Sequence, residues 1–172
     1  GGAMKRLYLL RHAKSDHGGL WGNDRERPLN QRGRQATGLI GGYVRQRELM
    51  PELVLCSTAV RARETWEGVA VELATAPPVE HRQGLYLASP DEILAEIGRC
   101  DDAVGSVMVI AHNPGLASLA LALANGSPPP AKLAKFPTCG LAEFELASPG
   151  WEDLQPGRTK LCNFIRPKEL TE

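Results

Sequence analysis

The chain has 172 residues, of which 42% are hydrophobic and 23% are charged, an ordinary composition for one globular domain with a buried core. Its twenty basic and twenty acidic side chains cancel. The chain therefore lacks the basic excess of nucleic-acid-binding and membrane-surface proteins, and we expect neither a nucleic-acid nor a membrane partner. This balance does not exclude a local basic pocket.

The cysteines and the apolar segments predict a reduced, cytoplasmic protein. No apolar run approaches the ~20 residues that span a bilayer, and "LYLL" is too short for the core of a signal peptide. The sequence contains no CxxC pair, so it indicates neither a zinc site nor a disulfide framework. The scattered cysteines are Cys56, Cys100, Cys139 and Cys162. We expect one domain over residues 4–168 and attribute residues 1–3 to cloning.

The first half of the chain alternates strands and helices. The apolar run at 7–10 predicts a strand, and the polar, Gly-rich segment 16–27 predicts a loop. Asn30 is the expected N-cap of a helix that continues towards Pro51. The run at 53–57 predicts a second buried strand. Apolar residues at helical spacing over 62–73 predict a helix that Pro77 ends.

The second half continues this alternation. Ser89 and Glu92 form a capping box, with Pro90 at the first helical position. The run at 107–111 predicts a third buried strand, followed by a helix that ends near Asn125-Gly126 and a surface loop at Pro128–Pro130. The segments 142–146 and 160–165 predict a final, antiparallel pair of strands. This order predicts an α/β fold, a three-layer α/β/α sandwich with a mostly parallel central sheet.

Reactive side chains follow three of the predicted strands. Arg11 and His12 follow the first, Ser57 and Arg61 the second, and His112 the third. Ligands of parallel sheets bind at the carboxyl ends of the strands, so we expect these side chains to converge on one cavity. The sequence therefore predicts a single site built from three strand ends.

Two arginines and two histidines suit a phosphoryl group. The guanidinium fork matches phosphate oxygens, and a neutral histidine can attack phosphorus to form a phosphoramidate. A second histidine can donate hydrogen bonds to oxygens that carry charge in the transition state. Lys14 and Ser15 are candidates for substrate binding, with the alternative that they only begin a loop.

Each of these residues has an ordinary alternative reading when it is taken alone. A single histidine or arginine after a strand is usually a polar surface residue or a satisfied core residue. Ser57 and Cys56 could be nucleophiles, but no G-x-S-x-G elbow surrounds Ser57 and Cys56 lies inside a strand. The combination of an adjacent Arg-His pair with two further strand ends favours the phosphoryl site.

Four segments resemble motifs of the histidine phosphatase superfamily, the phosphoglycerate mutase-like group. They are "LYLLRHAKS", "RPLNQRGRQA", "LCSTAVRARET" and "VMVIAHNPGL", in chain order. The spacing and the short chain are most similar to the SixA-type phosphohistidine phosphatase branch. The resemblance covers Leu7 to about Leu123 and implies a phosphoglycerate mutase-like fold.

The resemblance also implies the roles of four residues. His12 would be the phosphorylated nucleophile, Arg11 and Arg61 would hold the phosphoryl oxygens, and His112 would complete the pocket. It implies that neither a metal nor an organic cofactor is needed. The implied partner is a protein that bears phosphohistidine, or a small phosphorylated substrate.

Two departures from the family pattern affect these expectations. Ala13 stands where the common signature has glycine, so its methyl group could narrow the approach to the substrate. No acid matches the family's proton donor to an alcohol leaving group. The candidates for that role are Glu80, Asp91, Glu92 and His17, whereas Asp24 is a candidate for holding the loop.

The function that the sequence favours is a phosphatase with a covalent phosphohistidine intermediate, acting on phosphohistidine of a partner protein. One alternative is a phosphatase for small phosphate monoesters. Another is a non-catalytic module that binds phosphorylated partners, although such a module would need only the arginines and not His12.

Overall fold

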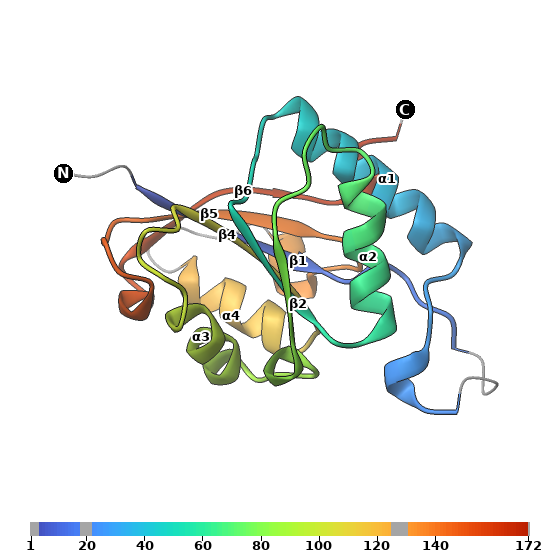
Figure 1. Cartoon of the computed structure of the whole chain (residues 1–172), viewed down its shortest axis with the longest axis horizontal. Helices are drawn as coiled ribbons and strands as arrows, with labels where there is room; N and C mark the ends of the chain where they lie inside the picture. Colours follow the sequence, from blue (N-terminus) through green and yellow to red (C-terminus); the bar gives the residue numbers. More distant parts are fainter. Residues whose placement is uncertain (1–3, 18–21, 125–130, 172) are drawn as a thin grey trace.

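The computed structural model describes residues 4–17, 22–124 and 131–171 (Figure 1). Within these ranges six strands form one sheet in the order β3-β2-β4-β1-β5-β6. They are β1 (Lys5–Arg11), β2 (Leu53–Ser57), β3 (Val79–Arg82), β4 (Ser106–Ala111), β5 (Leu141–Leu146) and β6 (Thr159–Ile165). The first four strands are parallel to one another, whereas β5 pairs antiparallel with β1, and β6 pairs antiparallel with β5. The predicted α/β fold and its antiparallel final pair are confirmed.

Helices cover both faces of the sheet, which confirms the three layers (Figure 1). One face carries α1 (Gln31–Gln46) and α2 (Val60–Ala70), and the other carries α3 (Pro90–Gly98) and α4 (Gly115–Leu123). A short helix, α5 (Ala131–Lys135), contacts α4 and was not expected from the sequence. The predicted helix end at Asn125-Gly126 and the Pro128–Pro130 loop lie outside the described residues.

The central strands divide their side chains between two apolar cores. In β1, Leu7 and Leu9 face the core under α3 and α4, whereas Tyr8 and Leu10 face the core under α1 and α2. Because side chains alternate along a strand and both faces are covered, such strands read as continuous apolar runs in the sequence. This burial fixes the register of the strand ends that carry the polar residues.

The helix starts agree with the capping signals in the sequence. The Asn30 side chain accepts a hydrogen bond from the Gly33 N–H, and Ser89 with Glu92 forms the capping box at the start of α3. By contrast, α1 ends at Gln46, well before Pro51. The chain leaves the helix through Glu48, whose φ of 55° is left-handed and breaks the helical path.

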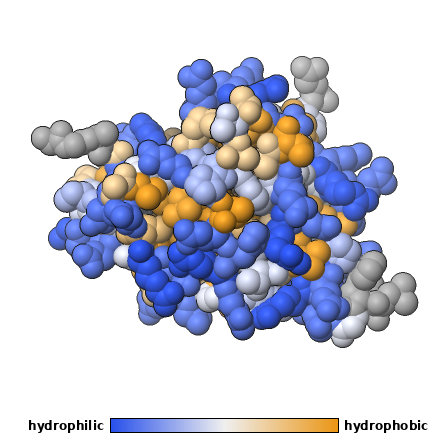
Figure 2. Space-filling model, in the orientation of Figure 1, coloured by the Kyte–Doolittle hydropathy of each residue, from blue (hydrophilic) through white to orange (hydrophobic). Residues whose placement is uncertain are grey.

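The surface is mostly polar. On the face seen in Figure 2, hydrophilic side chains predominate, and apolar ones gather in a band across the middle, at the level of the sheet. Among the described residues, no helix has the length and apolar character that crossing a membrane requires.

The start of α1 packs directly against the segment that follows β1. A Cβ atom on Gly33 would lie 2.1 Å from the Lys14 carbonyl oxygen, so only glycine permits this approach. The same carbonyl accepts a hydrogen bond of 3.0 Å from the Asn30 N–H. These contacts hold the polar residues that follow β1 at the carboxyl edge of the sheet.

Candidate phosphoryl-transfer site

A cavity of about 400 Å³ lies at the carboxyl ends of β1, β2 and β4. All six residues that the sequence singled out for the site line it, together with six others. The complete lining is Arg11, His12, Lys14, Ser15, His17, Asp24, Arg27, Arg61, Leu87, His112, Asn113 and Thr138. The parallel strands thus bring the predicted residues together, as the topology of such sheets requires.

His12 is a buried, neutral imidazole with a defined tautomer. Its Nδ1 lies 2.8 Å from the Ala13 carbonyl oxygen, and because a carbonyl can only accept, Nδ1 carries the proton. Burial lowers the pKa of His12 to about 3; the contact with Ala13 opposes this shift, and the positive charges of Arg61 and Arg11 add to it. The Nε2 lone pair is therefore available at neutral pH.

Ala13 does not obstruct the cavity, although it replaces the usual glycine. Its side chain is fully buried against the core under α1 and α2 and does not line the cavity. Its N–H donates a 2.8 Å hydrogen bond to Thr65 Oγ1, and that hydroxyl donates to the Arg61 carbonyl oxygen at 2.7 Å. Thr65 therefore ties the segment after β1 to helix α2.

The guanidinium groups of the two arginines are held in place by hydrogen bonds to oxygen atoms of Asp24 and Phe136. Arg61 is 2% exposed, and its guanidinium donates to the carbonyl oxygen of Asp24 at 2.8 Å and to Asp24 Oδ2 at 3.0 Å. Arg11 donates to the Phe136 carbonyl oxygen at 3.1 Å. The Nε atoms of both arginines are buried and have no partner among the described residues. A phosphoryl oxygen would satisfy these donors.

His112 is oriented by Ser57. Its Nε2 lies 2.7 Å from Ser57 Oγ, which also accepts from the Ala59 N–H at 3.3 Å. When the Ser57 hydroxyl donates to Nε2, the His112 proton lies on Nδ1. Burial, with help from Arg61, lowers the pKa of His112 to about 4. Its Nδ1 has no partner among the described residues, and in that tautomer it can donate to an oxyanion.

Asp24 and its neighbours form the part of the site that the sequence did not reveal. The carboxylate pairs with Arg61, accepts a hydrogen bond from the Tyr86 hydroxyl and accepts another, of 3.0 Å, from Arg27 Nε. Burial alone would raise its pKa, but these hydrogen bonds outweigh burial and hold the pKa of Asp24 far below its usual range. Arg27 also donates to Ser15 Oγ at 2.8 Å. Arg27 begins the "RPLNQRGRQA" motif, which was the available signal.

Of the other candidates for acid or nucleophile, only His17 lines the cavity among the described residues. Glu80 pairs with Arg82, Glu92 is used in the capping box of α3, and neither lines the cavity. Burial raises the pKa of Cys56 to about 12, so this thiol is not a thiolate at neutral pH. Among the described residues, no cluster of three His, Cys, Asp or Glu side chains could hold a metal ion.

Comparisons with known proteins show the family to which the chain belongs. Residues 7–86 match the histidine phosphatase superfamily (branch 1). An uncharacterized protein of Mycobacterium tuberculosis is 37% identical over 165 residues, which cover 92% of this chain and 100% of that protein.

Two solved structures assigned as SixA phosphohistidine phosphatases share the fold. The one from Nakamurella multipartitia is 26% identical, has a TM-score of 0.84 and covers 96% of this chain and 98% of that chain. The one from Agrobacterium tumefaciens is 27% identical, has a TM-score of 0.80 and covers 96% of this chain and 100% of that chain. From its motifs, its fold and these relatives, the chain belongs to the histidine phosphatase superfamily, branch 1.

Proposed function

We propose that the chain is a phosphatase that forms a covalent phosphohistidine on His12 and acts on phosphohistidine side chains of a partner protein. The observation that carries the proposal is the state of His12. Its Nδ1 donates to the Ala13 carbonyl oxygen, its pKa of about 3 keeps the ring neutral, and Nε2 retains its lone pair. A neutral, oriented imidazole is the form that attacks phosphorus.

The reaction has two displacements at phosphorus. In the first, His12 Nε2 forms a P–N bond as the P–N bond of the substrate breaks, and the leaving imidazole keeps the electron pair. In the second, water attacks phosphorus, the bond to Nε2 breaks, and phosphate leaves. Arg11, Arg61 and His112 would stabilise the equatorial oxygens in both steps through their unpartnered donors.

The ionisable side chains that line the cavity favour a substrate with a P–N bond. Among the described lining residues, Asp24 is the only carboxylate, and its low pKa keeps it ionised, so it cannot donate a proton to an alkoxide. A positioned general acid typically contributes about 10²–10⁴-fold to such a step. A phosphohistidine can instead take a proton from solvent on its free ring nitrogen before it leaves. The absence of this acid therefore handicaps esters far more than phosphoramidates.

The structures that are assigned as SixA phosphohistidine phosphatases support the same substrate class, since they match nearly the whole chain. A phosphate monoesterase is the alternative. A monoesterase would need a proton donor for its leaving group, and the described lining of the cavity contains no protonated carboxylic acid.

The test compares kcat/KM for a phosphohistidine peptide with kcat/KM for an aliphatic phosphate monoester. We expect the peptide to be preferred by at least about 10², the contribution of a general acid. Equal or better turnover of the ester would contradict the proposal, and replacing His17, Asp24 and Tyr86 one at a time would then locate the donor. Absence of turnover with either substrate would instead indicate a phosphate-binding module.

A further inference from the structure

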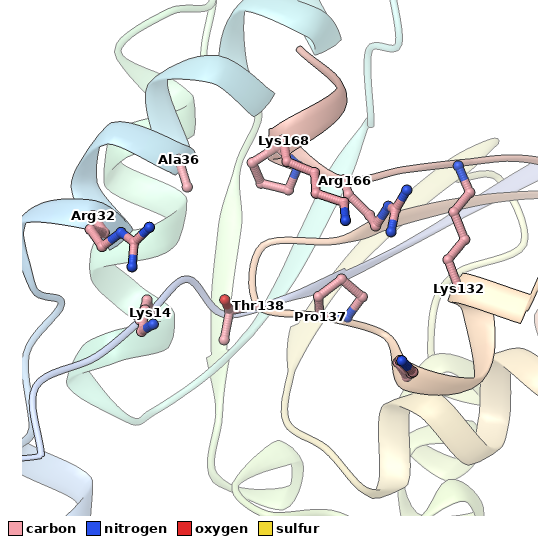
Figure 3. A pocket seen from close by; sticks show the side chains of 10 residues that line it. Lys14, Arg32, Ala36, Lys132, Pro137, Thr138, Arg166 and Lys168 are labelled. Atoms are coloured by element: carbon pink, nitrogen blue, oxygen red, sulfur yellow. The ribbon is translucent and has the colours of Figure 1, made fainter. Parts of the chain in front are cut away.

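A second cavity, of about 420 Å³, lies beside the phosphoryl site and is lined by cations. We call it the basic groove. Figure 3 shows Lys14 and Arg32 on one side of it and Lys132 and Arg166 on the other. The basic side chains that line it are Lys14, Arg32, Lys132, Lys135, Arg166 and Lys168. No acidic residue belongs to the described lining.

This concentration of positive charge is local, because the chain as a whole carries twenty basic and twenty acidic side chains. Lys132 and Arg166 share one counter-ion, Glu169, at 2.6 and 2.8 Å. The other four cations form no ion pair with any described residue. Holding like charges together without counter-ions is unfavourable, so the groove is suited to an anionic partner.

The groove is continuous with the phosphoryl site. Lys14 and Thr138 line both cavities, and Figure 3 shows Thr138 and Pro137 between the two sides of the groove. The Cys139 N–H contacts the carbonyl oxygens of Arg11 and His12 at 3.1 and 3.0 Å, which places this wall directly beside the nucleophile. A ligand whose phosphoryl group reaches His12 has room to extend past Thr138 into the groove.

The far side of the groove has a fixed shape. Glu169 accepts from the Arg166 side chain at 2.8 and 3.0 Å and from the Arg166 N–H at 3.1 Å, while it also pairs with Lys132. These contacts join the turn at Pro167–Glu169, which follows β6, to helix α5. These contacts connect the two segments that carry Lys132 and Arg166.

We infer that the basic groove binds an acidic segment of the phosphorylated partner protein, next to the histidine whose phosphoryl group enters the phosphoryl site. This inference rests on the proposed function and adds the recognition element. The groove takes carboxylates that flank the phosphohistidine, and charge complementarity sets the choice of partner.

The chemistry of the groove favours dispersed carboxylates over a compact second phosphate. Lysines outnumber arginines in it, and Lys14, Lys135 and Lys168 are exposed point charges on flexible stems. Such charges adapt to carboxylates at varied positions, whereas a phosphate site uses buried, preorganised donors such as Arg61. An acidic protein surface meets these conditions.

The experiment uses synthetic phosphohistidine peptides that carry a run of Glu on one side of the histidine, each matched by a peptide with Gln at the same positions. The groove variant is Lys135→Glu/Lys168→Glu. The matched control is Arg45→Glu/Arg158→Glu, which makes the same charge change at exposed residues that line neither cavity. Binding to each protein in a His12→Ala background reports on the groove, and turnover by the His12 proteins reports on the proposed function.

We expect the Glu peptide to bind about tenfold more tightly than the Gln peptide at low ionic strength, in line with a few exposed ion pairs. High salt should remove this difference, the groove variant should lose it, and the control should keep it. Turnover of para-nitrophenyl phosphate should be unchanged in the groove variant.

Equal binding of Glu and Gln peptides would overturn the inference and leave the proposed function standing. Charge-selective binding without turnover would contradict the proposed function, and the inference that the groove binds an acidic segment would stand. A single-stranded oligonucleotide that displaces the Glu peptide at lower concentration would show that the groove takes nucleic acid, and the inference would be wrong.

Discussion

The imidazole rings of His12 and His112 lie 5.2 Å apart between centroids, tilted by 52°. Both are neutral at pH 7, because burial lowers the pKa of His12 to about 3 and of His112 to about 4. Their hydrogen bonds leave different nitrogens available. His12 donates from Nδ1 and keeps an Nε2 lone pair, whereas His112 contacts Ser57 through Nε2 and leaves Nδ1 without a partner among the described residues. Two identical rings thus leave different nitrogens, Nε2 of His12 and Nδ1 of His112, without a hydrogen-bond partner among the described residues.

The first prediction concerns the nucleophile. Replacing His12 with Ala should abolish nearly all turnover, while phosphate binding persists because Arg11, Arg61 and His112 remain. Enzyme quenched during turnover should carry phosphate that survives alkali and is lost in acid, as a phosphoramidate is. Mapping of that phosphate to Ser57 or Cys56 would refute the assignment.

The second prediction concerns Arg61. Its guanidinium binds two oxygens of Asp24 and still has Nε available, and a lysine ammonium cannot do both. Arg61→Lys should therefore lower kcat by ~10²–10³, the usual effect of losing a transition-state donor. Arg63→Lys, at an exposed position on the same helix, is the matched control and should be neutral. Full activity of Arg61→Lys would place Arg61 outside the reaction.

The third prediction concerns Ser57, which touches His112. Ser57→Ala leaves the buried Nε2 of His112 without its partner and frees the ring to change tautomer. We expect kcat to fall by at most ~10²–10³, the effect of losing a transition-state donor, because the ring is then no longer held in one tautomer. KM should change little, since the arginines still bind the substrate. A kcat equal to that of the wild type, measured on protein that is folded at the assay temperature, would count against this positioning role.

The fourth prediction concerns pH. The ordinary pKa of histidine is about 6.5, and His12 is held near 3 in the folded protein. Between these values the unfolded chain binds more protons, so acidification favours unfolding, and the stabilisation present above pH 6.5 is lost progressively as the pH falls. Denaturant titrations at about pH 7 and about pH 5 should show this loss. It should be smaller in His12→Ala and unchanged in the exposed-site control His81→Ala. An identical loss in all three proteins would exclude His12 as a contributor.

The fifth prediction concerns metals. Every group assigned to the reaction is an imidazole, a guanidinium or a backbone contact, and none of the steps needs a Lewis acid. Dialysis against a chelator should leave kcat/KM for a phosphohistidine peptide unchanged. A loss that added divalent ions restore would require another mechanism.

The sequence predicts the fold well, and it predicts which residues lie together at the strand ends, because both depend on local patterns. Buried parallel strands read as continuous apolar runs, and the strand ends at Arg11, Ser57 and Ala111 lie where those runs stop. The capping signals at Asn30 and Ser89 are likewise local. The roles of His12 and His112 stay predictions until the variants are measured.

The remaining features depend on contacts between distant segments. Asp24 looks like a loop residue, and its contacts with Arg61 and Tyr86 join positions 37 and 62 residues apart. Ser57 was weighed as a nucleophile, and only the structure brings it to His112, 55 residues away. The basic groove likewise collects cations from both ends of the chain. No periodicity or short motif encodes such contacts.

The position of β1 in the sheet has a consequence for how the protein is made. The strand that delivers Arg11 and His12 is synthesised first, yet it pairs with β4 and β5, so that Arg6 lies opposite Ser106 and Lys5 opposite Leu146. Such long-range pairing delays strand assembly until the later segments have left the ribosome. A nascent chain that stops short of β4 has its nucleophile but neither flanking strand. The site around His12 therefore forms only after β4 and β5 have been synthesised.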